Sequence, residues 1–306
     1  MRELSCFSDG SVCVAAAASV SGRGALDRAL QAATTSVYRA VLSSGKEMLV
    51  RVTWTRSAAG VAGVAVAFDD GGGASSDAPA RTRPVLLLHK KRGSRSLVTG
   101  AGTAVGVHWD TAEAKYASWS SPSSPEPERD YCLAVVADAE LALLLGSGGA
   151  ARELSRRLAV APTAPALLVS RREQLRCAAA AHVTRCRFRE GGDEHEVAVH
   201  ACRGGGDDKG ELRVTIDGEK VAEVRRVGWG FRGNRAAVLA DGEVVDVMWD
   251  VHDWWFGGRG GSAGSGAQFM VKARAEKEGR LWMADDTAAR GQSPGGFFLH
   301  VQCYRR

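Results

Sequence analysis

The sequence predicts a mainly β fold made of two related antiparallel β units, sandwich or barrel-like, with an N-terminal amphipathic helix and short helices between the units. Short runs that alternate apolar and polar residues cover most of the chain. The chain holds 37 glycines and only 8 prolines, and glycine suits tight turns because it reaches positive φ without steric cost. A block of sequence near residue 100 also recurs near residue 240.

The overall composition is that of a globular protein. The 306 residues are 45% hydrophobic and 25% charged, which is enough for one large domain or two ordinary ones. The net charge of +5 comes from 40 basic and 35 acidic side chains spread along the chain, so it predicts only a weak attraction to anions. The seven cysteines are odd in number and form no CxxC pair, which indicates reduced thiols rather than a zinc site or a disulfide framework.

The sequence predicts a cytoplasmic or nuclear protein. No apolar run approaches the roughly 18 to 20 residues that cross a bilayer, so we expect no transmembrane segment. Residues 12 to 20 resemble a short signal-peptide core, but Glu3 and Asp9 precede it. The same acids count against an organellar transit peptide, which makes organelle import the less favoured alternative.

The first 45 residues are expected to contain a lead-in and one helix. Residues 1–23 show no sustained period and predict a poorly ordered segment. Residues 24–45 predict an amphipathic helix, because apolar side chains fall at intervals of three and four: Leu26, Leu30, Ala33, Val37 and Val41. Gly45 is placed to end it.

Residues 46–146 predict the first β unit. Here the period drops to two in short runs bounded by Gly, Asp, Ser or Pro, namely 47–54, 61–68, 84–90, 104–109, 131–137 and 141–146. The connections at 69–80 and 118–130 are rich in Gly, Ser and Pro and are expected to be exposed loops.

A helical connector is predicted over residues 147–181, before the second β unit at 182–306. "ARELSRRL" (151–158) reads as a helical turn or two. "SRREQLRCAAAA" (170–181) opens with Ser170 and Glu173 at the spacing of a capping box, in which the two side chains satisfy backbone donors of a helix N-terminus.

The internal repeat pairs "KRGSRSLVTGAGTAVGVHWD" (91–110) with "FRGNRAAVLADGEVVDVMWD" (231–250). Without a gap, nine of the twenty positions are identical. They are Arg92/Arg232, Gly93/Gly233, Arg95/Arg235, Val98/Val238, Gly102/Gly242, Val105/Val245, Val107/Val247, Trp109/Trp249 and Asp110/Asp250. We infer two related β units at about 46–146 and 182–304.

The repeated block reads as a hairpin whose second strand has one buried face. Val105, Val107 and Trp109 are two residues apart and share a face, as do their counterparts in the second copy. Gly102 or Gly242 supplies the turn, and each buried aliphatic side chain is worth about 1.5 to 3 kcal/mol. Asp110 and Asp250 then resemble capping residues at a helix N-terminus.

Several segments resemble the plant family catalogued as domain of unknown function 868. They are "SCFSDG", "PEPERDYCLAVVADAELALLLG", "VSRREQL" and "FRGNRAAVLADGEVVDVMWDVHDWWF", and the similarity covers nearly the whole chain. "CAAAAHVT" (177–184) departs from it, because the family would lead us to expect a more polar, basic stretch there. The resemblance implies almost nothing about activity.

The first candidate site is the repeated R-G-x-R motif, read as a turn: Arg92, Arg95, Arg232 and Arg235. Guanidinium forks at two related turns would bind a partner or a polyanion. The alternative is structural, with the arginines paired to nearby acids.

The second candidate site is a ligand pocket formed by Trp249, Asp250, His252, Asp253 and Trp255. Carboxylates beside an imidazole suit metal binding or acid-base chemistry. The earlier copy has Ala112 where His252 stands, which favours a structural role for the acids. Trp254 and Trp255 are adjacent, so in a strand one of them would face solvent and mark a contact surface. The alternative is that both are buried under the Gly-rich loop at 257–266.

No recognised catalytic motif is found, and we predict no catalytic residue, metal ligand set or cofactor. "GWGFRG" (228–233) fits GxGxxG, but a strand is expected after it, where a dinucleotide site needs a helix. The sequence therefore favours a non-enzymatic binding or scaffold module whose partner is another protein, or else an anionic ligand, with a nucleic acid as a less favoured partner. An enzyme or small-ligand binder with a pocket near Trp249, His252 and Trp255 is the alternative.

Overall fold

The structure is a computed structural model that describes residues 32–56, 62–70, 85–116, 124–146, 149–158, 161–162, 165–176, 180–203, 210–256, 266–274 and 296–304. Over these residues the predicted mainly β fold is confirmed. Three sheets are present, and none of them closes into a barrel. The predicted lead-in (1–23) and residues 71–80, 118–123 and 257–265 lie outside the described ranges.

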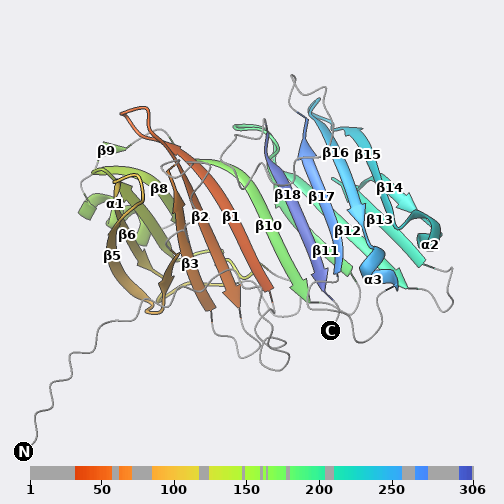
Figure 1. Cartoon of the computed structure of the whole chain (residues 1–306), viewed down its shortest axis with the longest axis horizontal. Coiled ribbons are helices and arrows are strands. Elements are labelled where there is room, and N and C mark those ends of the chain that lie inside the picture. The colour runs from red at the N-terminus through yellow and green to blue at the C-terminus, as the bar shows by residue number, and fades with distance from the viewer. Residues whose placement is uncertain are drawn as a thin grey trace, which may run out of the picture.

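A nine-stranded sheet spans the long axis of the molecule (Figure 1). In spatial order its strands are β15 (Arg232–Val238), β16 (Val244–Asp250), β17 (Gly266–Ala273), β18 (Phe298–Tyr304), β10 (Leu167–Arg176), β1 (Ala32–Val41), β2 (Glu47–Arg56), β3 (Ala62–Asp69) and β4 (Val85–Leu88). All neighbours are antiparallel except β10 and β18, which are parallel.

Two smaller sheets complete the fold. One consists of β5 (Arg92–Val98), β6 (Ala104–Asp110), β7 (Cys132–Ala137), β8 (Glu140–Gly146) and β9 (Ala161–Pro162). The other consists of β11 (Ala180–Cys186), β12 (His195–Arg203), β13 (Gly210–Ile216) and β14 (Glu219–Val224). The helices are α1 (Gly149–Leu158), α2 (Val227–Gly230) and α3 (His252–Phe256).

Both smaller sheets pack on the same face of the large sheet. On β10, Arg171 is paired with Ser36 of β1 and with Leu299 of β18, and directly paired residues share a face. Leu299 belongs to the apolar cluster under β11–β14, while Tyr38, on the face of Ser36, belongs to the cluster under β5–β8.

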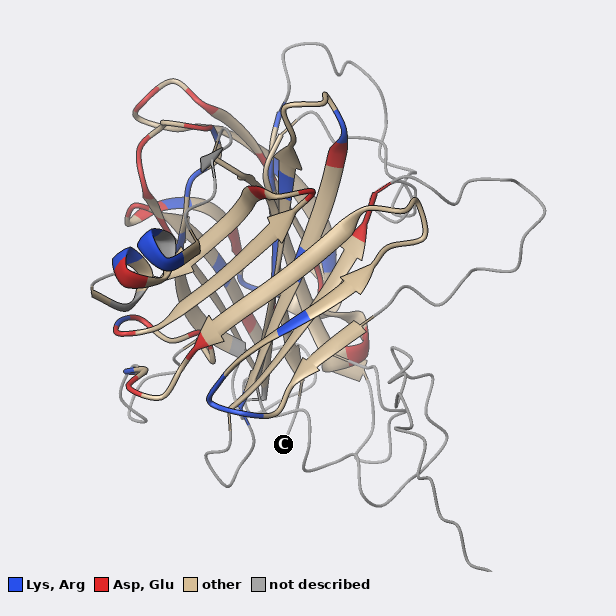
Figure 2. Cartoon of the chain, turned by 90° about the vertical axis from the view of Figure 1, so that its left-hand side faces the viewer, with Lys and Arg blue, Asp and Glu red and all other residues tan. Residues whose placement is uncertain are grey.

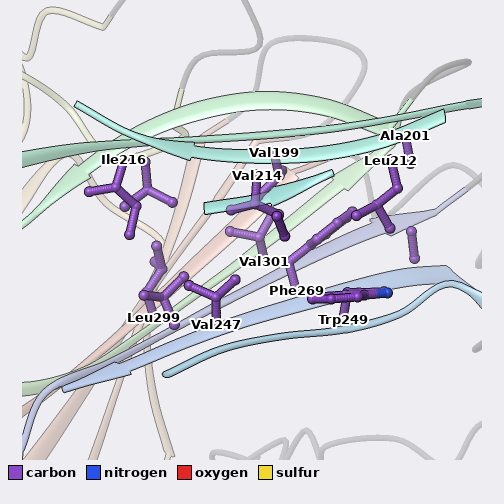
Figure 3. Packing of buried hydrophobic residues seen from close by; sticks show 14 of the residues in the cluster. Val199, Ala201, Leu212, Val214, Ile216, Val247, Trp249, Phe269, Leu299 and Val301 are labelled. Carbon is purple, nitrogen blue, oxygen red and sulfur yellow. The ribbon is translucent and has the colours of Figure 1, made fainter. Parts of the chain in front are cut away.

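Each smaller sheet forms a sandwich with the part of the large sheet that it covers: β5–β8 belong to the first sandwich and β11–β14 to the second. Each sandwich encloses one apolar cluster. In the second, Val199, Leu212 and Val214 point from the four-stranded sheet toward Val247 and Phe269 of the large sheet (Figure 3). In the first, residues of β1–β3 such as Val52 and Trp54 pack against β6 and β7 residues such as Val107 and Leu133. Leu168 on β10 contacts both clusters.

The helix predicted over residues 24–45 is wrong for residues 32–41, which form β1 at the centre of the large sheet; residues 24–31 lie outside the described ranges. The reason is that the inner face of β1 carries Thr34 and Ser36, each only 1% exposed, while Val37 lies on the outer face. The buried face is therefore polar at this point, which hid the period of two.

The helix predicted over residues 170–181 is also wrong. Residues 170–176 belong to β10, and residues 180 and 181 open β11. Arg171 and Glu173 are charged residues on the inner face of a central strand, a pattern that reads as an exposed helix. The helical turn predicted at 151–158 is confirmed by α1.

Candidate functional site

The hairpins β5–β6 and β15–β16, which contain the internal repeat, have the same register. Arg92 is paired with Asp110 and Gly93 with Trp109; likewise Arg232 is paired with Asp250 and Gly233 with Trp249. The turns also agree, since the Thr99 N–H donates to the Thr103 carbonyl at 2.9 Å and the Leu239 N–H to the Glu243 carbonyl at 2.8 Å. The predicted turn glycines, Gly102 and Gly242, have φ of 83° and 84°, where a Cβ is strained.

In each hairpin a tryptophan lies across a glycine of the edge strand. A Cβ on Gly93 would lie 2.7 Å from Cζ2 of Trp109, and one on Gly233 would lie 2.3 Å from Cζ2 of Trp249. The indole N–H groups donate to the carbonyls of Lys90 at 2.7 Å and Gly230 at 2.9 Å. Trp109 and Trp249 are 7% and 9% exposed, so the prediction that both point into the interior is confirmed.

The aspartate that ends each hairpin uses both carboxylate oxygens in the fold. Oδ1 of Asp110 accepts the Ala112 N–H at 3.0 Å, and Oδ1 of Asp250 accepts the His252 N–H at 3.0 Å. Oδ2 of each lies 2.7 Å from Nε of Arg92 or Arg232. Asp250 therefore caps the start of α3, where a helix N-terminus was predicted. The same prediction is wrong for Asp110, because a turn and not a helix follows it.

The four arginines of the repeat do not form turns. R-G-x-R instead opens strands β5 and β15, so its first and fourth residues project from opposite faces. Arg92 and Arg232 are held in the ion pairs just described. Arg95 and Arg235 are exposed and have no ion pair within the described part of the chain.

The second candidate site is filled by its own side chains. Trp249, Trp254 and Trp255 are all buried, and Trp255 packs so closely on β13 that a Cβ on Gly210 would collide with it. His252 Nδ1 lies 2.8 Å from a carboxylate oxygen of Asp253. Within the described residues, no three His, Cys, Asp or Glu side chains are arranged to hold a metal ion.

A buried ionic network, missed at the sequence level, lies between the two apolar clusters. Arg171 on β10 donates from Nε to Glu173 at 2.6 Å and from Nη1 to Glu126 at 2.7 Å. Glu173 also accepts hydrogen bonds from His182 Nε2 and, at 2.9 Å, from the Thr184 hydroxyl, both on β11. The network joins the loop before β7, the central strand β10 and the four-stranded sheet.

The electrostatics of this network favour its charged form. Burial alone would raise the pKa of Glu173, but the hydrogen bond from His182 and the charge of Arg171 outweigh it and lower the pKa to about 2. Burial, with the nearby Glu126 carboxylate, raises the pKa of Tyr38 to about 12. The only signal in the sequence was the Ser170 and Glu173 spacing, which resembles a capping box.

A polar cluster lies at one end of the second sandwich. His195 lies between two carboxylates, with Nδ1 2.7 Å from Asp217 and Nε2 3.3 Å from Asp241. Burial alone would lower the pKa of His195, but its hydrogen bonds to the carboxylates of Asp217 and Asp241 outweigh this effect and raise the pKa. Asp217 lies in the turn between β13 and β14 of the smaller sheet, and Asp241 lies in the turn between β15 and β16 of the large sheet. His195 therefore links the two layers.

Comparison with known proteins gives one match. A family model described as "Plant protein of unknown function (DUF868)" matches residues 29–301. Neither curated proteins nor solved structures gave a match. Among the described residues, the structure has no helix with the length and apolar character needed to span a bilayer.

Proposed function

We propose that this chain, which belongs to the DUF868 family of plant proteins of unknown function, is a non-enzymatic binding or scaffold module for a protein or anionic partner. The observation that carries the proposal is the pair of exposed arginines, Arg95 and Arg235, at matching positions on the two edge strands β5 and β15. The repeat keeps both, although neither forms an ion pair within the described residues.

The position of these arginines defines how a partner would meet them. Arg95 is paired with Val107 and Arg235 with Val247, so each projects from the core side of an edge strand. A charge pointing inward at an edge opposes the addition of a further strand. The guanidinium forks instead suit side-chain contacts to carboxylates or phosphates.

The first hairpin also presents a basic loop. The chain between β4 and β5 carries His89, Lys90 and Lys91, all exposed. Figure 2 views the molecule from the end at which this hairpin lies, with Lys and Arg in blue along the ribbon. Asp110 neutralises Arg92 but none of these residues. The loop therefore adds to the attraction that Arg95 would exert on an anionic partner.

The matched hairpins support a further part of the proposal, that the two units arose by duplication of one β unit. Register, turn, indole packing and the hydrogen bonds of the aspartate agree in the two copies. A shared ancestor explains why Arg95 and Arg235 occupy equivalent places, and it predicts that each unit offers one contact to the partner.

The test compares two double charge reversals. Arg95→Glu with Arg235→Glu should abolish quantitative affinity capture of partners from plant extract, while the melting temperature stays within about 2 °C. Arg92→Glu with Arg232→Glu is the matched control, because each new glutamate faces an aspartate and should lower stability. The proposal fails if the first pair captures the same proteins as the wild type, or if it unfolds the chain.

The alternative, an enzyme or small-ligand binder near Trp249, His252 and Trp255, is less well supported because both indoles fill the interior. His252 is the one member of this group with a half-exposed side chain and a carboxylate partner. Metal analysis of the purified protein, with His252→Ala as the control, tests its metal-binding version. Metal bound by the wild type and lost in the variant would favour the alternative.

A further inference from the structure

Helix α2 holds a tryptophan out in solvent. Trp229 is 85% exposed, whereas Val227, two residues earlier, is fully buried. A solvated indole contributes little to folding, because the hydrophobic effect depends on area removed from water. Its position therefore calls for an explanation outside the fold.

The orientation of Trp229 is fixed by its neighbours. Its N–H and that of Gly230 donate to the Arg226 carbonyl at 3.1 and 3.2 Å. A Cβ on Gly230 would lie 2.6 Å from Cγ1 of Val224, and the Gly230 carbonyl accepts the indole N–H of Trp249 at 2.9 Å. The backbone beneath Trp229 is thus tied to the core on both sides.

Other aromatic rings gather at the same end of the large sheet. Phe231, His252 and Phe256 form a cluster with ring centroids 5.1 to 5.5 Å apart, and Phe256 is 52% exposed. The Val251 N–H donates to the Phe231 carbonyl at 2.8 Å, which fixes α3 beside the residue that follows α2. We call Trp229, Phe231, His252 and Phe256 the Trp229 corner; α2 and α3 lie at one end of the molecule (Figure 1).

Arginines flank the Trp229 corner. Arg225 and Arg232 have side chains 81% and 61% exposed, and each pairs with one acid, Glu223 or Asp250. Arg226 is exposed and has no ion pair within the described ranges. An aromatic tip beside exposed guanidinium groups is complementary to a surface that is apolar inside and negatively charged outside.

We propose that the Trp229 corner docks on an anionic phospholipid surface, with Trp229 and Phe256 at the level of the headgroups and Arg226 against lipid phosphates. Indole side chains favour the interface between membrane and water, and exposed arginines are attracted to anionic leaflets. The inference rests on the proposed binding role and names the anionic partner for this end of the molecule. A flat protein partner fits less well, since the aromatic residues project from short helices at an end of the sheet. Arg235 on the adjacent edge strand also opposes the addition of a further strand.

Vesicle sedimentation of the full chain tests the proposal. The wild type should bind vesicles of phosphatidylcholine mixed with phosphatidylserine, and bind much less to phosphatidylcholine alone. Trp229→Ala should weaken the binding by about tenfold. Arg226→Glu should also weaken the binding, and its effect should be larger at low salt than at high salt. Val238→Ala is the matched control, because Val238 is also exposed and lies at the far end of β15; it should bind like the wild type.

A second measurement separates insertion from loss of folding. Vesicle lipids with brominated acyl chains should quench part of the wild-type tryptophan fluorescence, and this part should vanish in Trp229→Ala while thermal unfolding is unchanged. No vesicle binding by the wild type, equal binding by Trp229→Ala, or equal binding to neutral vesicles would each overturn the proposal. If vesicles do not bind but reversal of Arg95 and Arg235 still abolishes capture, the binding role stands and the membrane docking falls.

Discussion

Replacing Glu173 tests whether the buried network holds the two sandwiches together. Glu173→Ala removes the acceptor of hydrogen bonds from Arg171, His182 and Thr184. The side chains of Glu173 and His182 are each 3% exposed, so water cannot easily replace the lost partner. Arg171 would keep its ion pair with Glu126 and a hydrogen bond to the Ser124 hydroxyl at 3.4 Å.

The expected loss is about 3 to 5 kcal/mol of unfolding free energy, the range typical for breaking a buried ion pair by removing one partner. Each hydrogen bond to a charged group contributes about 1.5 to 3 kcal/mol. The total loss stays below the sum for three such bonds, because Arg171 retains its contact with Glu126. Glu173→Gln keeps the shape and one acceptor oxygen, so its loss should be smaller. The pKa of Glu173 is lowered from its ordinary 4.5 to about 2, so this stabilisation is present above pH 4.5 and is lost as the pH falls toward 2.

Urea denaturation followed by circular dichroism measures the change. In thermal denaturation the melting temperature of Glu173→Ala should lie about 6 °C or more below that of the wild type. Glu219→Ala is the control, because Glu219 is exposed on β14 and its loss should cost no more than about 0.5 kcal/mol. A loss below about 1 kcal/mol for Glu173→Ala, or an unchanged acid limb of the stability curve, would refute the reasoning.

Two further predictions concern the second sandwich. Gly233→Ala places a Cβ 2.3 Å from Trp249 and should cost about 1 to 3 kcal/mol by overpacking; a melting curve unchanged from the wild type would contradict the packing described. The pKa of His195 is raised by Asp217 and Asp241, so its stabilisation is full below about pH 6.5 and is lost as the pH rises through the folded value. Unfolding free energy measured from pH 6 to 9 should therefore decline more steeply in the wild type than in His195→Gln, and parallel curves would count against this role.

The outer strands of the fold were predictable from the sequence, but its centre was not. β6 and β16 alternate buried valines with half-buried residues, which is the pattern of a sheet with one face in a core. β1 and β10 lie between the two cores, where the buried face carries Thr34, Ser36 and Glu173. Polar residues on an inner face remove the period of two, so both strands looked like helices.

In the candidate sites, contacts between residues close in sequence were predictable, and contacts between distant residues were not. The repeat predicted the hairpins, the turn glycines and the cap of α3, because these contacts join residues close in sequence. It also suggested an arginine turn, which the register replaces with a strand whose arginines point to opposite faces. The network around Arg171 could not be predicted from the sequence, since Glu126 is 45 positions away from Arg171. Only the packing of the sandwiches brings the two residues together.

The place of β18 in the large sheet has a consequence for how the molecule is made. This strand lies between β17 and β10 and contributes Leu299, Val301 and Cys303 to the second core, although it is the last of the described strands along the chain. On a ribosome the first sandwich can assemble while the rest is still being polymerised. The second must wait, with β17 and β10 exposing unsatisfied edges, until residue 304 has emerged from the exit tunnel.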